Sequence, residues 1–214
     1  MLRRAFGFLA ASRLVAQLLF DVKLPSREPG ERYFDTTTLA LRGAAATHVS
    51  SSDRICDAGC GSFALLGLWL AQRSAHVVCT EIDPAIAARA DATVRLNGAD
   101  VEVRVAPLFG DGSERFDVIL FNPPYVPTAT GEARALPESH RTQWDGGPDG
   151  AATIREFLAA LAERSHGATA LLGVSRRHVP RARMEALVRE AGLHARELLP
   201  YRRLQVDVWV LTQR

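Results

Sequence analysis

Four consecutive residues, Asn122-Pro123-Pro124-Tyr125, have the side chains and the backbone needed to hold a planar amino group. The two prolines fix their own φ, keep the preceding residues extended and lack an N–H, so the backbone here is rigid and rich in acceptors. We expect the side-chain oxygen of Asn122 and the carbonyl of Pro123 to face one small space and to accept both hydrogens of an NH2 group. The nitrogen lone pair would then point at an electrophile, and Tyr125 would stack on the planar group that carries the nitrogen.

A second group of residues predicts a nucleoside cofactor. Asp57, Gly59, Cys60 and Gly61 lie between an apolar run and a helical segment, and Glu81 ends the next apolar run about 20 residues later, where an acid meets ribose hydroxyls. The glycines let a ligand approach the backbone, and the helix N-terminus that follows offers free N–H groups. A carboxylate at position 57 would repel a pyrophosphate but would pair with the amino group of a methionine moiety. The segment therefore predicts S-adenosylmethionine (SAM) in preference to NAD.

Together the two groups predict transfer of the sulfonium methyl of SAM to a planar NH2 nitrogen by in-line displacement. No strong base is needed, because the nitrogen becomes acidic only as the new bond forms and then loses its proton to water. Orientation and desolvation are expected to supply most of the catalysis. The alternative for the Asn122 motif is a strand exit that prolines merely stiffen. The alternative for the glycine segment is a tight turn with a purely structural role. Phe63, which stands where dinucleotide-binding proteins have a third glycine, favours SAM over NAD.

The elements that must position these residues alternate along the chain. Strands are expected over 54–57, 76–80, 101–105, 116–121 and 168–174, and helices over 36–49, 64–72, 84–97, 151–164 and 180–191. Buried apolar runs separated by helices predict a parallel sheet covered on both faces. Two further strands, 195–199 and 205–212, are joined by a short turn at 200–203 and should pair antiparallel.

This pattern predicts an α/β fold, a doubly wound seven-stranded Rossmann-like sheet with an antiparallel C-terminal hairpin, as in SAM-dependent methyltransferases. We expect N-terminal helices and a lid region over 1–50 and the methyltransferase domain over 51–214. The connection 123–149 contains five prolines and no clear periodicity. Because it leaves the carboxyl end of the fourth strand, where open α/β sheets bind ligands, we predict that it is a substrate loop.

Composition narrows the class of protein. The 214 residues include 26 Lys plus Arg and 24 Asp plus Glu, and a net charge of +2 does not indicate a nucleic-acid binder. The three cysteines lack zinc-ligand spacing, so we expect reduced thiols, with Cys56 and Cys79 on neighbouring buried strands, no metal and a cytoplasmic location. No apolar stretch is long enough to span a membrane. The first 20 residues, basic and without acids, are typical of a transit peptide, but we expect a helix lying on the domain.

The chain resembles the amino-methyltransferases with the Asn-Pro-Pro-Tyr motif, and among them the HemK-like group, which methylates a glutamine side-chain amide of translation release factors. The resemblance extends from about Phe34 to the C-terminus and includes Trp144-Asp145-Gly146-Gly147-Pro148-Asp149-Gly150, similar to that group's Gly-Gly-x-x-Gly segment. It implies a catalytic motif made of Asn122, Pro123, Pro124 and Tyr125. It also implies cofactor contacts from Thr36, Asp57, Gly59, Cys60, Gly61, Glu81, Ile82, Leu108 and Asn122.

The sequence departs from that group at two places. Pro107-Leu108-Phe109 stands where relatives have Asp-Leu-Phe beside the adenine; the Leu108 N–H remains, so a lost hydrogen bond of about 0.5–1.5 kcal/mol should weaken binding without abolishing it. Residues 1–50 are too few for the N-terminal helical domain of the bacterial release-factor enzymes, and short relatives depend on a small activator subunit.

The acceptor is therefore left open. A protein glutamine is the first choice. Adenine N6 of RNA or DNA is the alternative, and it would need a flipped or single-stranded base and a path of basic side chains. The only candidates for that path are Arg176, Arg177, Arg181 and Arg183. A small metabolite as acceptor and a catalytically idle scaffold are the remaining hypotheses.

Overall fold

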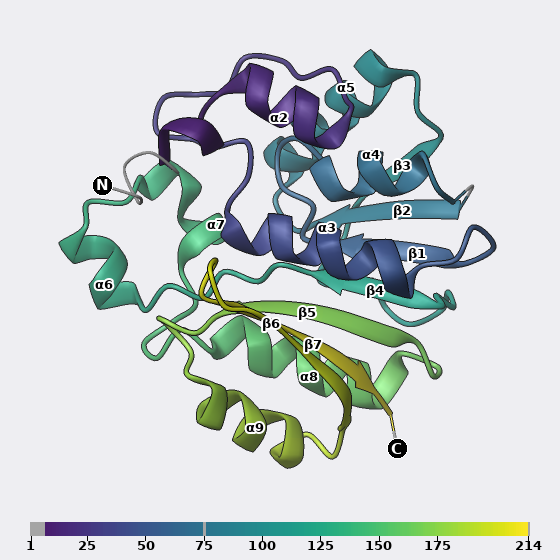
Figure 1. Ribbon diagram of the computed structural model, residues 1–214, viewed down its shortest axis with the longest axis vertical. Coiled ribbons are helices and arrows are strands. Elements are labelled where there is room, and N and C mark those ends of the chain that lie inside the picture. Colours follow the sequence, from purple (N-terminus) through teal and green to yellow (C-terminus); the bar gives the residue numbers. More distant parts are fainter. Residues whose placement is uncertain (1–6, 75, 214) are drawn as a thin grey trace.

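The computed structural model describes residues 7–74 and 76–213, so the first six residues of the predicted basic N-terminal helix lie outside it. Its centre is a seven-stranded sheet in the order β3-β2-β1-β4-β5-β7-β6 (Figure 1). The first five strands are parallel, and β7 runs antiparallel between β5 and β6. This confirms the predicted doubly wound sheet with its antiparallel hairpin. The strands are β1 Arg54–Ala58, β2 His76–Glu81, β3 Val101–Val105, β4 Val118–Phe121, β5 Thr169–Ser175, β6 His194–Tyr201 and β7 Val206–Thr212.

Helices cover both faces of the sheet and enclose two apolar clusters. One face packs against α2 Arg13–Phe20, α3 Thr36–His48, α4 Leu65–Ala71 and α5 Pro84–Asn97. The other packs against α8 Ala152–Arg164 and α9 Arg181–Glu190 (Figure 1). The central strand β4 is buried along its whole length, as a parallel strand covered on both sides should be.

Local sequence signals determine where two of these helices begin and end. The Asp83 side chain caps α5 by accepting from Ala85 N–H, Pro84 is its first residue, and Gly98 ends it in the left-handed region at φ 60°. Asp35 caps α3 in a capping box with Thr38. These caps need only neighbours in sequence, which explains why both predicted starts agree with the structure.

The segment 123–149 contains more regular structure than expected. It includes α6 Thr128–Ala133, the 3-10 turn Glu138–His140 and α7 Arg141–Trp144. Helices of four to six residues are too short to produce a hydrophobic period, which is why the sequence shows none. The segment folds back on itself, since Val126 N–H donates to Trp144 O at 2.9 Å and Gly146 N–H donates to Val126 O at 2.9 Å.

The final hairpin differs from its prediction. Its turn was expected at 200–203, but β6 continues through Pro200 to Tyr201, and the turn follows at 202–205. Proline is tolerated there because β6 is the edge strand and pairs only with β7. The same turn meets the carboxyl end of β5, where Arg176 N–H donates to Gln205 O at 3.0 Å.

The remaining expectations concern the thiols and the N-terminal region. Cys56 and Cys79 are buried free thiols on the neighbouring strands β1 and β2, as predicted. Helix α2 packs on α4, which confirms a helix lying on the domain. Within residues 7–74 and 76–213, no helix is long and apolar enough to cross a bilayer.

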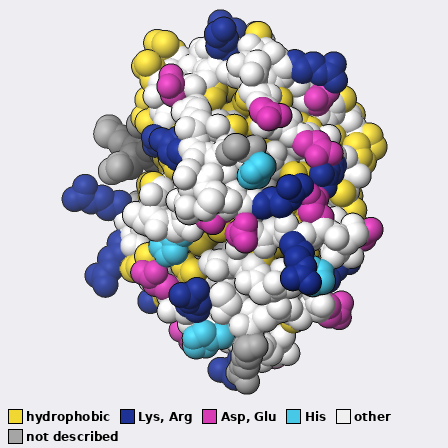
Figure 2. Space-filling view, turned by 90° about the vertical axis from the view of Figure 1, so that its right-hand side faces the viewer, with side chains coloured by type: hydrophobic (Ala, Val, Ile, Leu, Met, Phe, Trp, Pro, Cys, Tyr) yellow, Lys and Arg dark blue, Asp and Glu magenta, His cyan; other side chains and the backbone are white. Residues whose placement is uncertain are grey.

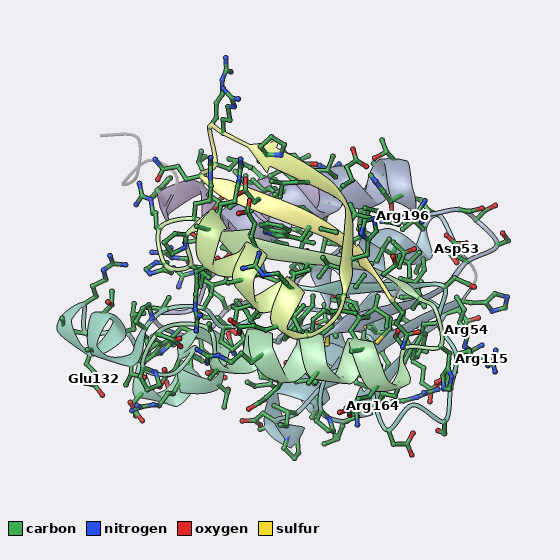
Figure 3. The ribbon with its side chains drawn as sticks, turned by 90° about the horizontal axis from the view of Figure 1, so that it is seen from below. Asp53, Arg54, Arg115, Glu132, Arg164 and Arg196 are labelled. Carbon is green, nitrogen blue, oxygen red and sulfur yellow. The ribbon has the colours of Figure 1, made fainter. Side chains whose placement is uncertain are left out.

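The amino and carboxyl ends of the parallel strands lie on opposite sides of the molecule. Figure 3 shows Asp53 and Arg54 at the amino edge, opposite Glu132, which belongs to the segment that leaves the carboxyl end of β4. The amino-edge face carries acidic and basic side chains interspersed (Figure 2). The strand order reverses between β1 and β4, and open α/β sheets bind ligands at the carboxyl ends of such a pair.

Candidate active site

The two predicted motifs leave the sheet side by side, at the carboxyl ends of β1 and β4. The parallel register pairs Asp57 with Leu120 and Ala58 with Phe121, so the glycine loop and Asn122 emerge as neighbours. A Cβ at Gly59 would lie 3.2 Å from the Phe121 ring, and Gly59 has φ 62°, so both space and conformation require glycine. The fold thus brings together motifs that are separated by about 60 residues in the sequence.

The glycine loop curls over the end of β2 and leaves an open space. Cys60 N–H donates to Thr80 O at 2.9 Å, and Gly61 N–H donates to Glu81 Oε2 at 3.2 Å. A Cβ at Gly61 would meet no atom within 4 Å among the described residues. The loop therefore exposes backbone to a ligand, and the space is of the kind that the predicted cofactor needs.

Asp57 is a buried carboxyl group at the base of this loop. Its Oδ2 accepts from Gly67 N–H in the first turn of α4 at 2.9 Å, whereas Oδ1 has no hydrogen-bond partner within the described chain. Burial raises the pKa of Asp57 to about 7; the Gly67 hydrogen bond lowers the pKa, and the nearby Glu81 charge raises it further. Because a cation at Oδ1 would stabilise the ionised form, Asp57 suits the amino group of a methionine moiety.

Glu81 is held rigidly beside the loop. Its Oε1 accepts from Ile82 N–H at 2.9 Å and from Asp83 N–H at 3.2 Å, and burial raises its pKa against these hydrogen bonds. With Gly61 also bound at Oε2, the carboxylate still has a lone pair for a hydroxyl donor. The adjoining Ile82 is 60% exposed, so its side chain offers an apolar surface to a flat base.

Leu108 lies in the segment that is expected to meet the adenine. It adopts φ 50°, a strained conformation for a leucine, and its carbonyl accepts from the Thr80 hydroxyl. Its N–H donates to no group in the described part of the chain, so the donor needed for the predicted adenine contact is free.

Asn122 has a buried acceptor with no partner. Its Nδ2 donates to Asp35 Oδ1 at 3.3 Å and to Thr38 Oγ1 at 3.4 Å, both at the start of α3. Its Oδ1 is fully buried and accepts no hydrogen bond from the residues described. Leaving such an atom unpaired costs about 1–3 kcal/mol, which a ligand N–H would recover.

The Tyr125 side chain is fixed at both its hydroxyl and its ring. Its hydroxyl donates to Asp35 Oδ2 at 2.8 Å and lies 2.7 Å from Thr37 Oγ1. The ring that stacks on it belongs to His178, with centroids 5.9 Å apart and planes at 25°. Burial and the Asp35 charge hold the pKa of Tyr125 well above its usual value. Burial and the Arg134 charge lower the pKa of His178. Both rings are therefore neutral near pH 7.

The structure adds site residues that the sequence analysis did not single out. These are Asp35, Thr37, Thr38 and His178. Thr36, which was predicted to reach the cofactor, begins α3 and makes no side-chain hydrogen bond in the described chain. The one sequence signal that points to Asp35 and Thr38 is their spacing of three residues, which is typical of a helix cap.

The glycines of the 144–150 segment support the backbone of the Asn122 motif. A Cβ at Gly146 would lie 2.8 Å from Pro124 O and 2.7 Å from Gly150 O, and one at Gly150 would lie 2.5 Å from Tyr125 O. These distances are too short for any side chain, so the segment packs directly on the motif.

Replacing Gly146 by alanine is therefore expected to shift the Pro124 backbone and to lower turnover by about a hundredfold, since displacements near 1 Å have that effect. Binding of the cofactor should be unchanged, because the loop at Gly61 is formed by β1 and β2. Steady-state kinetics and a binding titration check this. Gly7→Ala is the control, as its Cβ would lie 3.9 Å from the nearest atom; wild-type turnover in Gly146→Ala would contradict the supporting role.

Comparison with known proteins finds a matching family and similar sequences. The model of the methyltransferase small domain family matches residues 31–137. The chain is 37% identical over 144 residues to a release factor glutamine methyltransferase of Caulobacter vibrioides, covering 64% of this chain and 49% of that protein. It is 41% identical over 91 residues to a tRNA1(Val) (adenine(37)-N6)-methyltransferase of Bacteroides thetaiotaomicron, covering 40% and 38%.

The fold is shared more widely than the sequence. A solved structure of a methyltransferase from Pyrococcus furiosus aligns with a TM-score of 0.67 over 98% of this chain and 96% of its own, at 15% sequence identity. The chain spans about half the length of the release factor glutamine methyltransferases that it matches.

Proposed function

The chain belongs to the methyltransferase small domain family, and we propose that it transfers the methyl group of SAM to a planar NH2 nitrogen, with a protein glutamine side-chain amide as the first-choice acceptor. The observation that carries this proposal is the buried, unpartnered Oδ1 of Asn122, next to the glycine loop at the carboxyl edge. An orphan acceptor at this place is what an incoming N–H donor requires.

The residues around the glycine loop fit SAM. Gly59 and Gly61 leave backbone and space open, Asp57 has a free carboxylate oxygen for an ammonium group, and Glu81 has a free lone pair for a ribose hydroxyl. Exposed Ile82 offers an apolar surface for the adenine. Leu108 contributes a free N–H beside it. Bound SAM would supply an electrophilic methyl group.

The chain's own residues then orient the acceptor. Asn122 Oδ1 accepts one hydrogen of the NH2 group and the Pro123 carbonyl accepts the other, which fixes the nitrogen and directs its lone pair. Tyr125 is neutral and tied to Asp35, so it closes one side of the site and does not act as a base. The proton that the nitrogen loses passes to water after transfer. Catalysis on this account comes from positioning and from exclusion of water.

The charges around the site favour a protein amide over adenine in a nucleic acid. Three of the four arginines that could guide a phosphate backbone are occupied: Arg181 and Arg176 pair with the buried Asp207 at 3.0 and 3.7 Å, and Arg183 pairs with Asp149 at 3.5 Å. A strongly binding nucleic-acid surface needs several free cations. Adenine N6 stays the second candidate, because a relative named for that activity is 41% identical to this chain over 91 residues.

Parallel acceptor assays test the proposal. SAM with a labelled methyl group is added to four separate reactions, which contain a release factor, total RNA, DNA or a metabolite extract as the acceptor. We expect label in the protein fraction and, after digestion, on a glutamine side chain. Label confined to adenine would replace the first-choice acceptor by the second. No label in any fraction, with SAM bound, would contradict the methyltransferase activity.

A further inference from the structure

We propose that Asp35 is a positioning residue that fixes the Asn122 amide with its oxygen toward the acceptor, so that the site selects an NH2 group and rejects a carboxylate. The inference rests on the proposed function, because it assigns the polarity of the same site. The Asp35 side chain binds Asn122 and Tyr125 of the motif, and it acts through these two side chains.

The Asp35 carboxylate is the centre of a hydrogen-bond network at the start of α3. Its Oδ1 accepts from Thr38 N–H at 2.7 Å, from the Thr38 hydroxyl at 2.8 Å and from Asn122 Nδ2 at 3.3 Å. Its Oδ2 accepts from the Tyr125 hydroxyl at 2.8 Å. One side chain therefore caps a helix and holds both polar groups of the motif.

This network leaves the Asn122 amide only one favourable orientation. The single hydroxyl proton of Thr38 goes to Asp35, so Thr38 Oγ1 faces Asn122 as an acceptor. With the amide reversed, Asn122 Oδ1 would face this oxygen and the Asp35 carboxylate with no hydrogen between them. Nδ2 must therefore point toward α3, and Oδ1 must point away from it, where it is the unpartnered acceptor.

No cation offsets the Asp35 charge within the described residues. Asp35 has no ion-pair partner there, and its charge is met only by hydrogen-bond donors on Thr38, Asn122 and Tyr125. The nearby His178 ring is neutral near pH 7. A carboxylate in the acceptor position would thus face the Asn122 oxygen with a negative charge behind it.

The chemical consequence is discrimination between glutamine and glutamate. A glutamine amide offers two hydrogens to acceptors that need them, whereas a glutamate carboxylate offers none. Sites built to hydrogen-bond a donor reject analogues that lack it by several orders of magnitude. The orientation imposed by Asp35 therefore makes a glutamate peptide a poor ligand.

Asp35→Ser and Asp35→Asn test this inference. Serine keeps an N-cap acceptor for Thr38 but lacks the second oxygen and cannot hold Asn122 as closely; asparagine keeps the shape and removes the charge. The probes are a glutamine peptide that the wild-type protein methylates and the same peptide with glutamate at that position. We expect the inhibition constant of the glutamate peptide, relative to KM of the glutamine peptide, to fall about tenfold or more in Asp35→Ser and by less in Asp35→Asn.

A purely structural role would change the constants of both peptides together and leave their ratio unaltered, and that result would overturn the inference. Ser12→Ala is the matched control. Ser12 caps α2 by accepting from Val15 N–H at 3.4 Å and contacts no site residue, so its loss should lower stability without moving the ratio.

A second measurement needs no acceptor. Hydrogen exchange of the Asn122 side-chain NH2, assigned by NMR from its absence in Asn122→Ala, is expected to be about tenfold faster in Asp35→Ser than in the wild type and unchanged in Ser12→Ala. Equal exchange in wild type and Asp35→Ser would overturn the role of Asp35. If the wild type methylates no glutamine peptide, the proposed function fails, and this measurement still decides whether Asp35 holds the amide.

Discussion

Asn122→Ala is expected to lower the rate of methyl transfer by about 10²–10³-fold, while SAM still binds, because it removes the orphan acceptor on which orientation of the nitrogen depends. Alanine keeps the backbone between β4 and Pro123 and deletes only the amide. The loss should therefore appear in kcat at saturating SAM. Single-turnover transfer and a calorimetric SAM titration measure the two effects separately.

Asn97→Ala is the matched asparagine control. Unlike Asn122, Asn97 uses both ends of its amide within the fold: it donates to Lys23 O at 2.8 Å and accepts from Lys23 N–H at 2.7 Å, at the end of α5. It should lose stability and keep turnover. Full activity in Asn122→Ala, or loss of SAM binding together with activity, would show that the assigned role is wrong.

The affinity for SAM is expected to fall about tenfold per pH unit as the pH drops below 7 and to level off above it. In the free protein, burial first and then the Glu81 charge raise the pKa of Asp57 to about 7. The cationic amino group of SAM stabilises the carboxylate, so the pKa falls on binding, and below pH 7 binding must expel a proton. Affinity is therefore present above pH 7 and is lost as the pH falls through this value. Calorimetry in buffers of different ionisation enthalpy counts the released proton.

Asp57→Asn should weaken SAM binding by about tenfold to a hundredfold, because it removes one charge-assisted hydrogen bond. It should also flatten the pH dependence of SAM binding. Asp53→Asn is the control, since Asp53 lies at the amino edge, where its Oδ2 accepts from Ser50 N–H at 2.7 Å (Figure 3). A slope that persists in Asp57→Asn would assign the titration to another group, Glu81 being the nearest.

The sequence predicts the structure most accurately where an element depends on local signals. The bounds of α5 follow from Asp83, Pro84 and Gly98, all within or next to the helix, and its predicted range of 84–97 agrees with the structure. The sheet followed from apolar runs whose burial is set by their own composition. The short helices of 123–149 were missed because helices of four to six residues leave no hydrophobic period in the sequence; they are held by tertiary packing, such as that of Gly131 in α6 against the Trp144 ring in α7.

In the candidate site, too, the sequence predicts the residues with local signals and misses a residue that depends on contacts between distant segments. Asp57, Glu81 and Asn122 could be named because each lies at the end of a strand, and parallel strands place their carboxyl ends at one edge. Asp35 could not, because its partners Asn122 and Tyr125 are 87 and 90 residues away and only the fold brings them to the start of α3. From the sequence, Asp35 is only a helix cap.

The most direct test of this account is to locate the transferred methyl group. Wild-type protein and Asn122→Ala are each incubated with labelled SAM and a glutamine-containing acceptor, and the modified atom is identified by mass spectrometry and NMR. We predict label on the side-chain amide nitrogen with the wild type and about 10²–10³-fold less with Asn122→Ala, at equal occupancy by SAM. Label on any atom other than a planar NH2 nitrogen, or equal transfer by the two proteins, would contradict it.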